Sequence, residues 1–211
     1  ADLNKQVIDL NKYKLFGGDI KNMFAVENEQ NSEVVFTSPA LATSVGNIYM
    51  PHAFPPNYQI KSNWINYGAQ FCIYSDFVNS YDPADKRLGW YLFEYTDLKG
   101  VNHNLRDPKD VGRAVRCFKY VPDPNAISQN NGNDIPMIRY AEILLNRSEA
   151  LNELNGPNLE SIDLINQVRT RAGVANYKVS DFASKEEFRD AILKERGWEF
   201  VAEGLRRMDL I

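Results

Sequence analysis

The stretch "IPMIRYAEILLNRSEALNE", residues 135–153, decides the fold. Its apolar residues recur at helical spacing, and Pro136 suits the first turn of a helix because that position needs no backbone N–H partner. The glycine and proline at 156–157 form a strong stop signal. The sequence therefore predicts a helix from about Pro136 to Leu154.

Two further helices are predicted after this one. The first runs from about Leu159 to Arg171 and ends at Gly173. The second begins at Ser184, where "SKEE" has the pattern of a capping box, and continues to about Glu203. A helix, a short turn and a second helix within about 34 residues are typical of a tetratricopeptide unit. One such unit cannot bury its apolar face alone, so partner helices are expected upstream.

Residues 1–134 have a different pattern. Long loops rich in Pro, Asn and Gly separate short strand-like runs at 32–37, 87–95 and 114–121, and residues 68–83 have a helix-like spacing. The predicted fold class is therefore mostly α, with a loop-rich subdomain bearing short β-strands (1–134) and a tetratricopeptide-like helical segment (135–211). Because neither end carries a clear boundary signal, we expect both to be parts of one larger domain, cut at each end.

The bulk composition excludes several classes of protein. The 211 residues carry a net charge of −4, which gives no basic surface for nucleic acid. No apolar run approaches the roughly 18 residues of a membrane-spanning helix, and the first residues do not form a signal peptide. The protein is thus cytoplasmic, or its targeting segment lies outside this sequence. Cys72 and Cys117 could form a disulfide, but isolated cysteines are more often small buried residues.

Carboxylates follow the predicted helices in stripes, at Glu142, Glu149 and Glu153 and again at Glu195, Glu199 and Glu203. Paired carboxylates in a cleft are the machinery of a glycosidase. However, arginines recur in each helix, and guanidinium–carboxylate pairs between packed helices satisfy both charges. We therefore predict a structural ion-pair scaffold, formed by Arg139, Glu142, Glu149, Arg169, Arg171, Glu195, Arg196, Glu199, Glu203 and Arg206.

No other pattern predicts catalysis, a metal or a cofactor. The two histidines, His52 and His103, lie near no nucleophile motif, and no zinc-protease, phosphate-loop or CxxC pattern occurs. Asp82, Asp85 and Asp97 are loop carboxylates whose spacing does not match a calcium-binding EF-hand. The sequence therefore predicts a protein without catalytic residues, bound metal or cofactor.

Aromatic residues in the loops are the candidates for ligand binding. A sugar ring has an apolar face and polar edges, so carbohydrate sites stack it on aromatic rings and flank it with amides and carboxylates. The loop 47–68 offers Tyr58, Trp64 and Tyr67 among several Asn and Gln residues, and Trp90 lies in the next aromatic stretch. Each could instead pack beneath a loop. Trp64 is the first choice, whereas Trp198 is assigned to the core.

Several segments together resemble one known family. "DIPMIRYAEILLNRSEALNE", "INQVRTRAG" and "FRDAILKERGWEFVAEGLRRMDL" follow one another in the order and spacing of the C-terminal signature of SusD/RagB outer-membrane nutrient-binding lipoproteins. Upstream, "NKYKLFGGDIKNMF", "NSEVVFT", "YDPADKR" and "FKYVPDP" are also similar to the family. The family's N-terminal part, with its signal peptide, lipidation cysteine and further helices, has no counterpart here, and neither does the end of its domain beyond Ile211.

The resemblance implies a non-catalytic protein anchored by lipid on the outer face of the outer membrane of Bacteroidetes-type bacteria. Such proteins capture oligosaccharides, or in some members peptides, for uptake through a SusC-like, TonB-dependent barrel. Ligand contacts differ among members, so the resemblance assigns no binding residue. Three alternatives remain: a peptide-binding RagB-like protein, a glycan-cleaving enzyme, and a cytoplasmic tetratricopeptide adaptor.

Overall fold

The computed structural model describes residues 2–68, 70–107, 109 and 114–211. The α-helices are α1 (Asp2–Asp9), α2 (Tyr49–Ala53), α3 (Ser75–Asn79), α4 (Tyr140–Asn155), α5 (Leu159–Ala172), α6 (Lys185–Glu199) and α7 (Arg206–Asp209). Short 3-10 helices span Ile20–Asn22, Val26–Asn28, Lys86–Trp90 and Val179–Asp181. The strands are β1 (Val34–Ser38), β2 (Tyr91–Leu92), β3 (Glu94–Thr96), β4 (Asn102–Asn104), β5 (Arg116–Cys117) and β6 (Ile135–Arg139).

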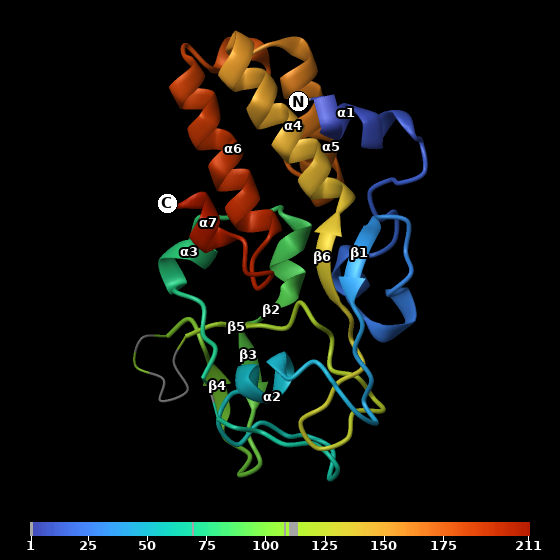
Figure 1. The fold of residues 1–211 in the computed structure, drawn as a ribbon. Helices are drawn as coiled ribbons and strands as arrows, with labels where there is room; N and C mark the ends of the chain where they lie inside the picture. The colour runs from blue at the N-terminus through green and yellow to red at the C-terminus, as the bar shows by residue number, and fades with distance from the viewer. Residues whose placement is uncertain (1, 69, 108, 110–113) are drawn as a thin grey trace.

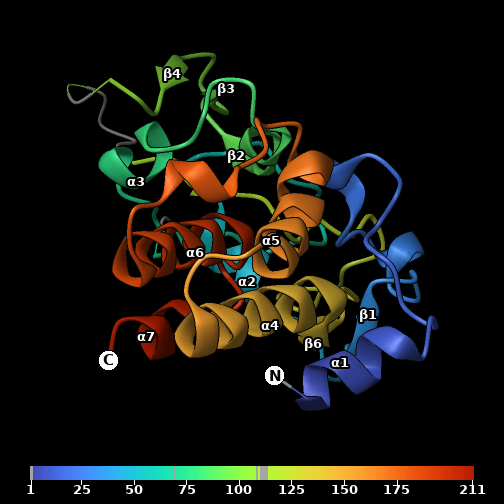
Figure 2. The same cartoon turned by 90° about the horizontal axis from the view of Figure 1, so that it is seen from above.

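The long helices α4, α5 and α6 pack side by side at one end of the molecule, with α1 against α4 (Figures 1 and 2). The predicted stop at Gly173 and the predicted cap at Ser184 are confirmed, and Asn158 forms a further cap that was not predicted. Asn158 caps α5 in a reciprocal capping box with Ser161, and Gly173 ends that helix with a left-handed φ of 80°. Ser184 accepts a hydrogen bond from the Glu187 backbone N–H at the start of α6. The mostly helical fold class is confirmed.

The predicted start of the first long helix is wrong. Residues 135–139 form strand β6, which pairs antiparallel with β1, and the helix begins only at Tyr140. Pro136 therefore lies in a strand of a two-stranded ribbon, a position that tolerates a missing N–H. The reason for the difference is tertiary: β1 supplies backbone partners from about a hundred residues upstream, which local periodicity does not reveal. The last long helix also ends early, at Glu199, and Ala202 has a left-handed φ of 62°.

The opposite end of the molecule is built from loops joined by short antiparallel ribbons, β1–β6, β2–β5 and β3–β4 (Figure 1). Here the predicted elements are largely shorter than expected. The run 87–95 begins in a 3-10 helix, only Arg116–Cys117 of 114–121 is a strand, and the helix within 68–83 is limited to Ser75–Asn79. Aromatic packing rather than a regular backbone ladder organises this region, as its buried cluster shows.

Two clusters of buried apolar residues form the cores, one at the loop-rich end and one among the long helices. The predicted subdomain boundary at 134/135 does not divide their residues completely. Val7 and Ile8 of α1 pack against the core of α4, α5 and α6. Conversely, Val201 belongs to the core of the loop-rich end. Cys117 is buried and Cys72 is exposed, and no disulfide joins them. No helix in the part of the chain that the structure describes is long and apolar enough to cross a membrane.

Candidate glycan-binding site

The loop that follows α2 lies at the end of the molecule away from α4, α5 and α6 (Figure 1). Its residues line a groove. The volume of the groove is about 400 Å³. The groove is lined by two tyrosines, two asparagines and small or aliphatic residues: Pro56, Asn57, Tyr58, Ile60, Asn66, Tyr67, Gly68 and Leu98. Two of the predicted binding residues, Tyr58 and Tyr67, thus lie in the same cavity.

A tight turn at residues 97–101 carries Leu98, which lines the groove. The Asp97 carboxylate accepts hydrogen bonds from the backbone N–H groups of Lys99 and Val101 at 2.8 and 2.9 Å, and these bonds hold its pKa below the ordinary value. The turn is fixed to the loop because the Leu98 N–H donates to the Asn57 carbonyl at 2.9 Å. Leu98 is 67% exposed, so its side chain offers an apolar surface at the groove.

Tyr67 is held in place on several sides, and the residue stays 40% exposed. The ring stacks on His52 with centroids 4.8 Å apart, and the hydroxyl donates to Gln129 Oε1 at 2.8 Å. Gly68, with a φ of 72°, turns the chain just after it and donates its N–H to Asn66 Oδ1 at 2.7 Å. A ring fixed before binding loses little conformational entropy when a ligand stacks on it.

Tyr58 and Trp64 lie on an aromatic stack centred on Phe54. Tyr58 is 5.5 Å from Phe54 and nearly parallel to it, and burial raises the pKa of its hydroxyl. Trp64 stacks on Phe54 at 5.9 Å but is not part of the groove lining. Its ring is half-buried and has the Lys61 ammonium 5.6 Å from its centroid. The structure therefore brings Tyr58 and Tyr67 together and leaves Trp64 beside them.

Trp90, the fourth predicted binding residue, is not part of the groove lining. Its side chain is completely buried in the loop-rich core, and its indole N–H donates to the Ile20 carbonyl at 2.8 Å. The Lys119 ammonium lies 4.1 Å from the ring centroid. The surrounding sequence alternates like a half-exposed strand, but Lys86–Trp90 winds into a 3-10 helix that turns this ring inward.

The groove combines apolar ring faces with amide groups, and none of its described lining side chains is charged. Asn66 is already engaged, because its side-chain amide donates to the Pro55 carbonyl. The side chain of Asn57 is exposed and makes no hydrogen bond to any residue in the described ranges. Such a surface can stack a sugar ring and exchange hydrogen bonds with its hydroxyls. Asn57 and Leu98 were missed by the sequence analysis, because loop residues carry no periodic signal.

A larger cavity, of about 780 Å³, lies between residues 13–18 and α5. Its lining also combines aromatic residues, Tyr13, Phe16 and Tyr140, with polar side chains such as Lys14, Lys86 and Asp163, but it contains none of the predicted binding residues. The Tyr58–Tyr67 groove contains two of those residues, and none of its described lining side chains is charged. We therefore take the Tyr58–Tyr67 groove as the candidate site.

The glutamates of the helices are engaged in a buried ion-pair network where the helical end meets the loop-rich end. Arg139 binds Glu33 and Glu199 at 2.6 Å and Glu203 at 2.7 Å. Further pairs join these residues to neighbouring helices and loops: Arg87 with Asp85, Glu195 and Glu199, Arg169 with Glu195, Arg171 with Glu33 and Glu199, and Lys119 with Glu203. Below, "the ion-pair network" means these residues.

The network differs in membership from the predicted scaffold. Glu142 forms no ion pair with the described residues, and burial raises the pKa of its carboxyl. Glu149 likewise forms none within the described part of the chain, and Arg206 is exposed, with one bond to the Leu193 carbonyl. Arg196 pairs with Asp209 rather than with a glutamate. Glu33, Asp85, Arg87 and Lys119 were not predicted, because they lie far upstream in the irregular half.

Glu199 is the most strongly perturbed acid of the network. Complete burial would raise the pKa of its carboxyl, but the opposing effect of Arg171, Arg139 and Arg87 is larger and holds that pKa far below 4.5. A carboxylate that stays ionised and fully paired at neutral pH is a poor proton donor. The ion-pair network is therefore suited to stabilising the fold, and Glu199 is unsuited to general acid catalysis.

The Glu199 carboxyl predicts a loss of stability in acid. Its pKa is lower in the folded than in the unfolded chain, so the unfolded state binds more protons as the pH falls through this window. Its contribution is complete above the unfolded pKa near 4.5 and disappears as the pH falls toward the folded pKa. Urea unfolding followed from pH 7 to pH 3 should show a falling free energy of unfolding. Glu199→Gln should flatten that decline; an unchanged slope would contradict the assignment.

The fold and the residues now define a family. A family model described as the SusD family matches residues 73–211, and the chain belongs to this family. Among curated relatives, "SusD-like protein P2" from Formosa agariphila is 35% identical over 127 residues, which is 56% of this chain and 22% of that protein. The chain thus spans about a fifth of that relative's length.

Solved structures of the same fold extend the similarity to nearly the whole chain. Surface glycan-binding protein A from Bacteroides uniformis has a TM-score of 0.72 at 25% identity, over 99% of this chain and 43% of that one. Surface glycan-binding protein A from Bacteroides thetaiotaomicron, in complex with laminarihexaose, has a TM-score of 0.69 at 21% identity, over 98% of this chain and 48% of that one. This chain therefore corresponds to about half of each structure.

Proposed function

We propose that the protein is a non-catalytic binding protein that captures glycans at the cell surface. The observation that carries the proposal is the groove, in which a fixed, exposed tyrosine ring lies beside a second tyrosine and an available asparagine amide. Membership of the SusD family supports it, as does the glycan-binding name of the Bacteroides uniformis relative. Because none of the described lining side chains carries a charge, the groove suits a neutral glycan.

The ion-pair network argues against the glycan-cleaving alternative. A glycosidase needs two carboxyl groups facing one cleft, about 5 to 9.5 Å apart, one of which holds a proton at working pH. Glu195, Glu199 and Glu203 are instead bound to arginine or lysine side chains inside the protein. Peptide capture of the RagB type stays as the second candidate, since tyrosine faces and amides also bind peptides.

We further propose the family's cellular setting for this chain. The protein is held on the outer face of the outer membrane by a lipid and passes its ligand to a SusC-like, TonB-dependent barrel. The family membership supports this proposal. Co-purification of a barrel of this type with the tagged protein from membranes tests the partner, and recovery of the protein alone would count against it.

Native electrophoresis through gels that contain single polysaccharides, with reducing ends assayed in parallel, tests the binding function. We expect retardation in at least one neutral polysaccharide and no new reducing ends. Retardation by peptides only would favour the RagB-like alternative, and new reducing ends would identify an enzyme. No retardation in any gel and no binding of peptides would reject the capture function.

Tyr67→Ala is expected to weaken glycan affinity about tenfold, because it removes the exposed stacking face, and a tenfold change corresponds to about 1.4 kcal/mol. The affinity is measured by the concentration dependence of gel retardation. Tyr74→Ala is the matched control, since Tyr74 is 87% exposed and lies outside the groove. Equal effects of the two substitutions would show that the groove is not the binding surface.

A further inference from the structure

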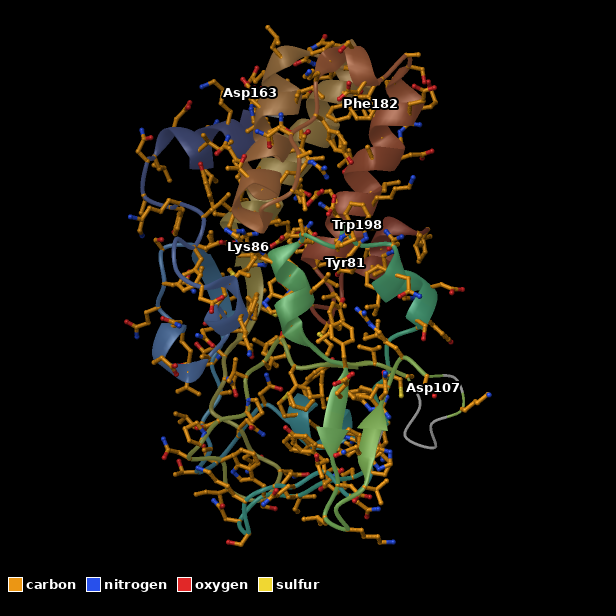
Figure 3. All side chains as sticks on the ribbon, turned by 180° about the vertical axis from the view of Figure 1, so that it is seen from behind. Tyr81, Lys86, Asp107, Asp163, Phe182 and Trp198 are labelled. Carbon is orange, nitrogen blue, oxygen red and sulfur yellow. The ribbon has the colours of Figure 1, made fainter. Side chains whose placement is uncertain are left out.

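A third, smaller cavity lies between the segment that follows α3 and the end of α6. Figure 3 shows Tyr81 and Trp198 side by side there, where the helical end meets the loop-rich end. The cavity has a volume of about 280 Å³. Its lining combines two aromatic rings with hydroxyl, carboxylate and guanidinium groups: Ser80, Tyr81, Asp82, Asp85, Arg169, Val174 and Trp198.

The two aromatic rings form a fixed corner. Their centroids are 5.8 Å apart and their planes are inclined by 44°. The Trp198 indole N–H donates to Ser80 Oγ at 2.9 Å, and the Tyr81 hydroxyl donates to the Trp198 carbonyl at 2.9 Å. Trp198 packs against the core but stays half-buried. Its assignment to the core is therefore only part of its role, because it also forms a wall of this cavity.

Arg169 supplies a donor that is fixed but not fully used. The residue is only 7% exposed, and its guanidinium lies 3.7 Å from the Tyr177 ring. Nη1 binds Glu195 at 2.7 Å and Nε donates to the Ala175 carbonyl at 2.8 Å. Nη2 makes no hydrogen bond to the described residues, and this nitrogen is not fully buried. Since Arg169 lines the cavity, this nitrogen is available to an acceptor there.

Asp82 supplies the complementary acceptor. Its Oδ1 accepts the Ala84 backbone N–H at 2.8 Å, and no ion pair to it is formed within the described ranges. The other cavity carboxylate, Asp85, is bound to Arg87. These groups suit a sugar. Its hydroxyls can accept hydrogen bonds from the Arg169 guanidinium and donate hydrogen bonds to the Asp82 carboxylate, while the sugar ring stacks on Trp198.

We propose that this cavity is a second carbohydrate subsite, which takes a single neutral sugar ring against Trp198. The proposal rests on the proposed function, since it assumes that the protein handles glycans. Its volume lies just below the roughly 300–1,000 Å³ of sites for drug-sized ligands, so one ring fits and an oligosaccharide does not. We therefore expect the subsite to bind a chain end or a side branch.

Fluorine NMR of the protein labelled with 5-fluorotryptophan tests this proposal. The sequence contains three tryptophans, and each has a different environment: Trp64 beside the groove, Trp90 in the core and Trp198 in the cavity. Single Trp→Phe variants assign the resonances. The probes are the methyl glycosides of glucose, galactose, mannose and N-acetylglucosamine, titrated one at a time, together with a polysaccharide that retards the protein in native gels.

We expect at least one methyl glycoside to shift the Trp198 resonance to saturation while that of Trp90 stays fixed. Asp82→Asn should weaken this binding about tenfold, because a hydrogen bond to a charged group is lost while the amide oxygen still accepts the Ala84 N–H. Asp76→Asn, a substitution on α3 outside the cavity lining, is the matched control and should leave the titration unchanged.

The possible results separate this proposal from the function itself. If the polysaccharide is bound and no glycoside moves the Trp198 resonance, the second subsite is rejected and the capture function stands. If Trp198 shifts but Asp82→Asn and wild type saturate at the same concentration, direct recognition in the cavity is rejected. If neither gels nor NMR detect any sugar, the proposed function itself fails.

Discussion

Replacing Arg139 by alanine is expected to lower the free energy of unfolding by about 3–5 kcal/mol, the range found when one partner of a buried ion pair is removed. The side chain is 1% exposed and binds three carboxylates, Glu33, Glu199 and Glu203. Without it, these acids keep their burial but lose their principal counter-charge. The guanidinium also lies 4.6 Å from the centroid of the Phe200 ring, so the substitution removes packing as well.

Urea unfolding at pH 7 measures this effect, and Arg206→Ala is the matched control. It removes the same type of side chain, but Arg206 lies at the start of α7, is exposed and donates only to the Leu193 carbonyl. Its cost should stay within about 1 kcal/mol. Arg139→Lys should fall between the two, since it keeps the charge and loses the forked geometry. If the two alanine variants were equally stable, the ion-pair network would not hold the two ends of the molecule together.

The contrast between Arg139 and Arg206 also shows what sequence could and could not predict. Both arginines occur in the helical pattern, and both were assigned to the scaffold on spacing alone. Helix ends such as Gly173 and Ser184 were predictable, because capping is a local effect of a few neighbouring residues. Ion-pair partners were not: Glu33 and Arg171 are separated by 138 residues, so only the folded chain brings them together.

The sequence predicted the chemistry of the candidate site but not all of its residues, because some of them are brought together only by the folded chain. A loop rich in aromatic and amide residues indicated carbohydrate chemistry, and it supplied Tyr58 and Tyr67. Leu98 reaches the groove through a hydrogen bond between two distant loops, which no local pattern encodes. Trp90 shows the converse limit, because its run alternates like a half-exposed strand, yet the folded chain buries this side chain completely.

Trp90→Ala is therefore expected to act on stability rather than on binding. The substitution empties a large, fully enclosed volume and should cost about 3–5 kcal/mol. It also leaves the Ile20 carbonyl without its donor and removes the ring that faces the buried Lys119 ammonium, whose pKa is already lowered by burial. Thermal unfolding followed by circular dichroism measures the loss, and the affinity for glycan is measured well below the unfolding temperature.

Trp90→Phe separates the contributions at this position. It keeps most of the packing against the Phe24 ring, 6.0 Å away, but loses the indole N–H, so its cost should be smaller than that of alanine. Both variants should keep the glycan affinity of the wild type while folded, because the groove lining does not include residue 90. A Trp90→Ala protein of normal stability that had lost its affinity would return Trp90 to the binding surface, and would mean that this core opens to its ligand.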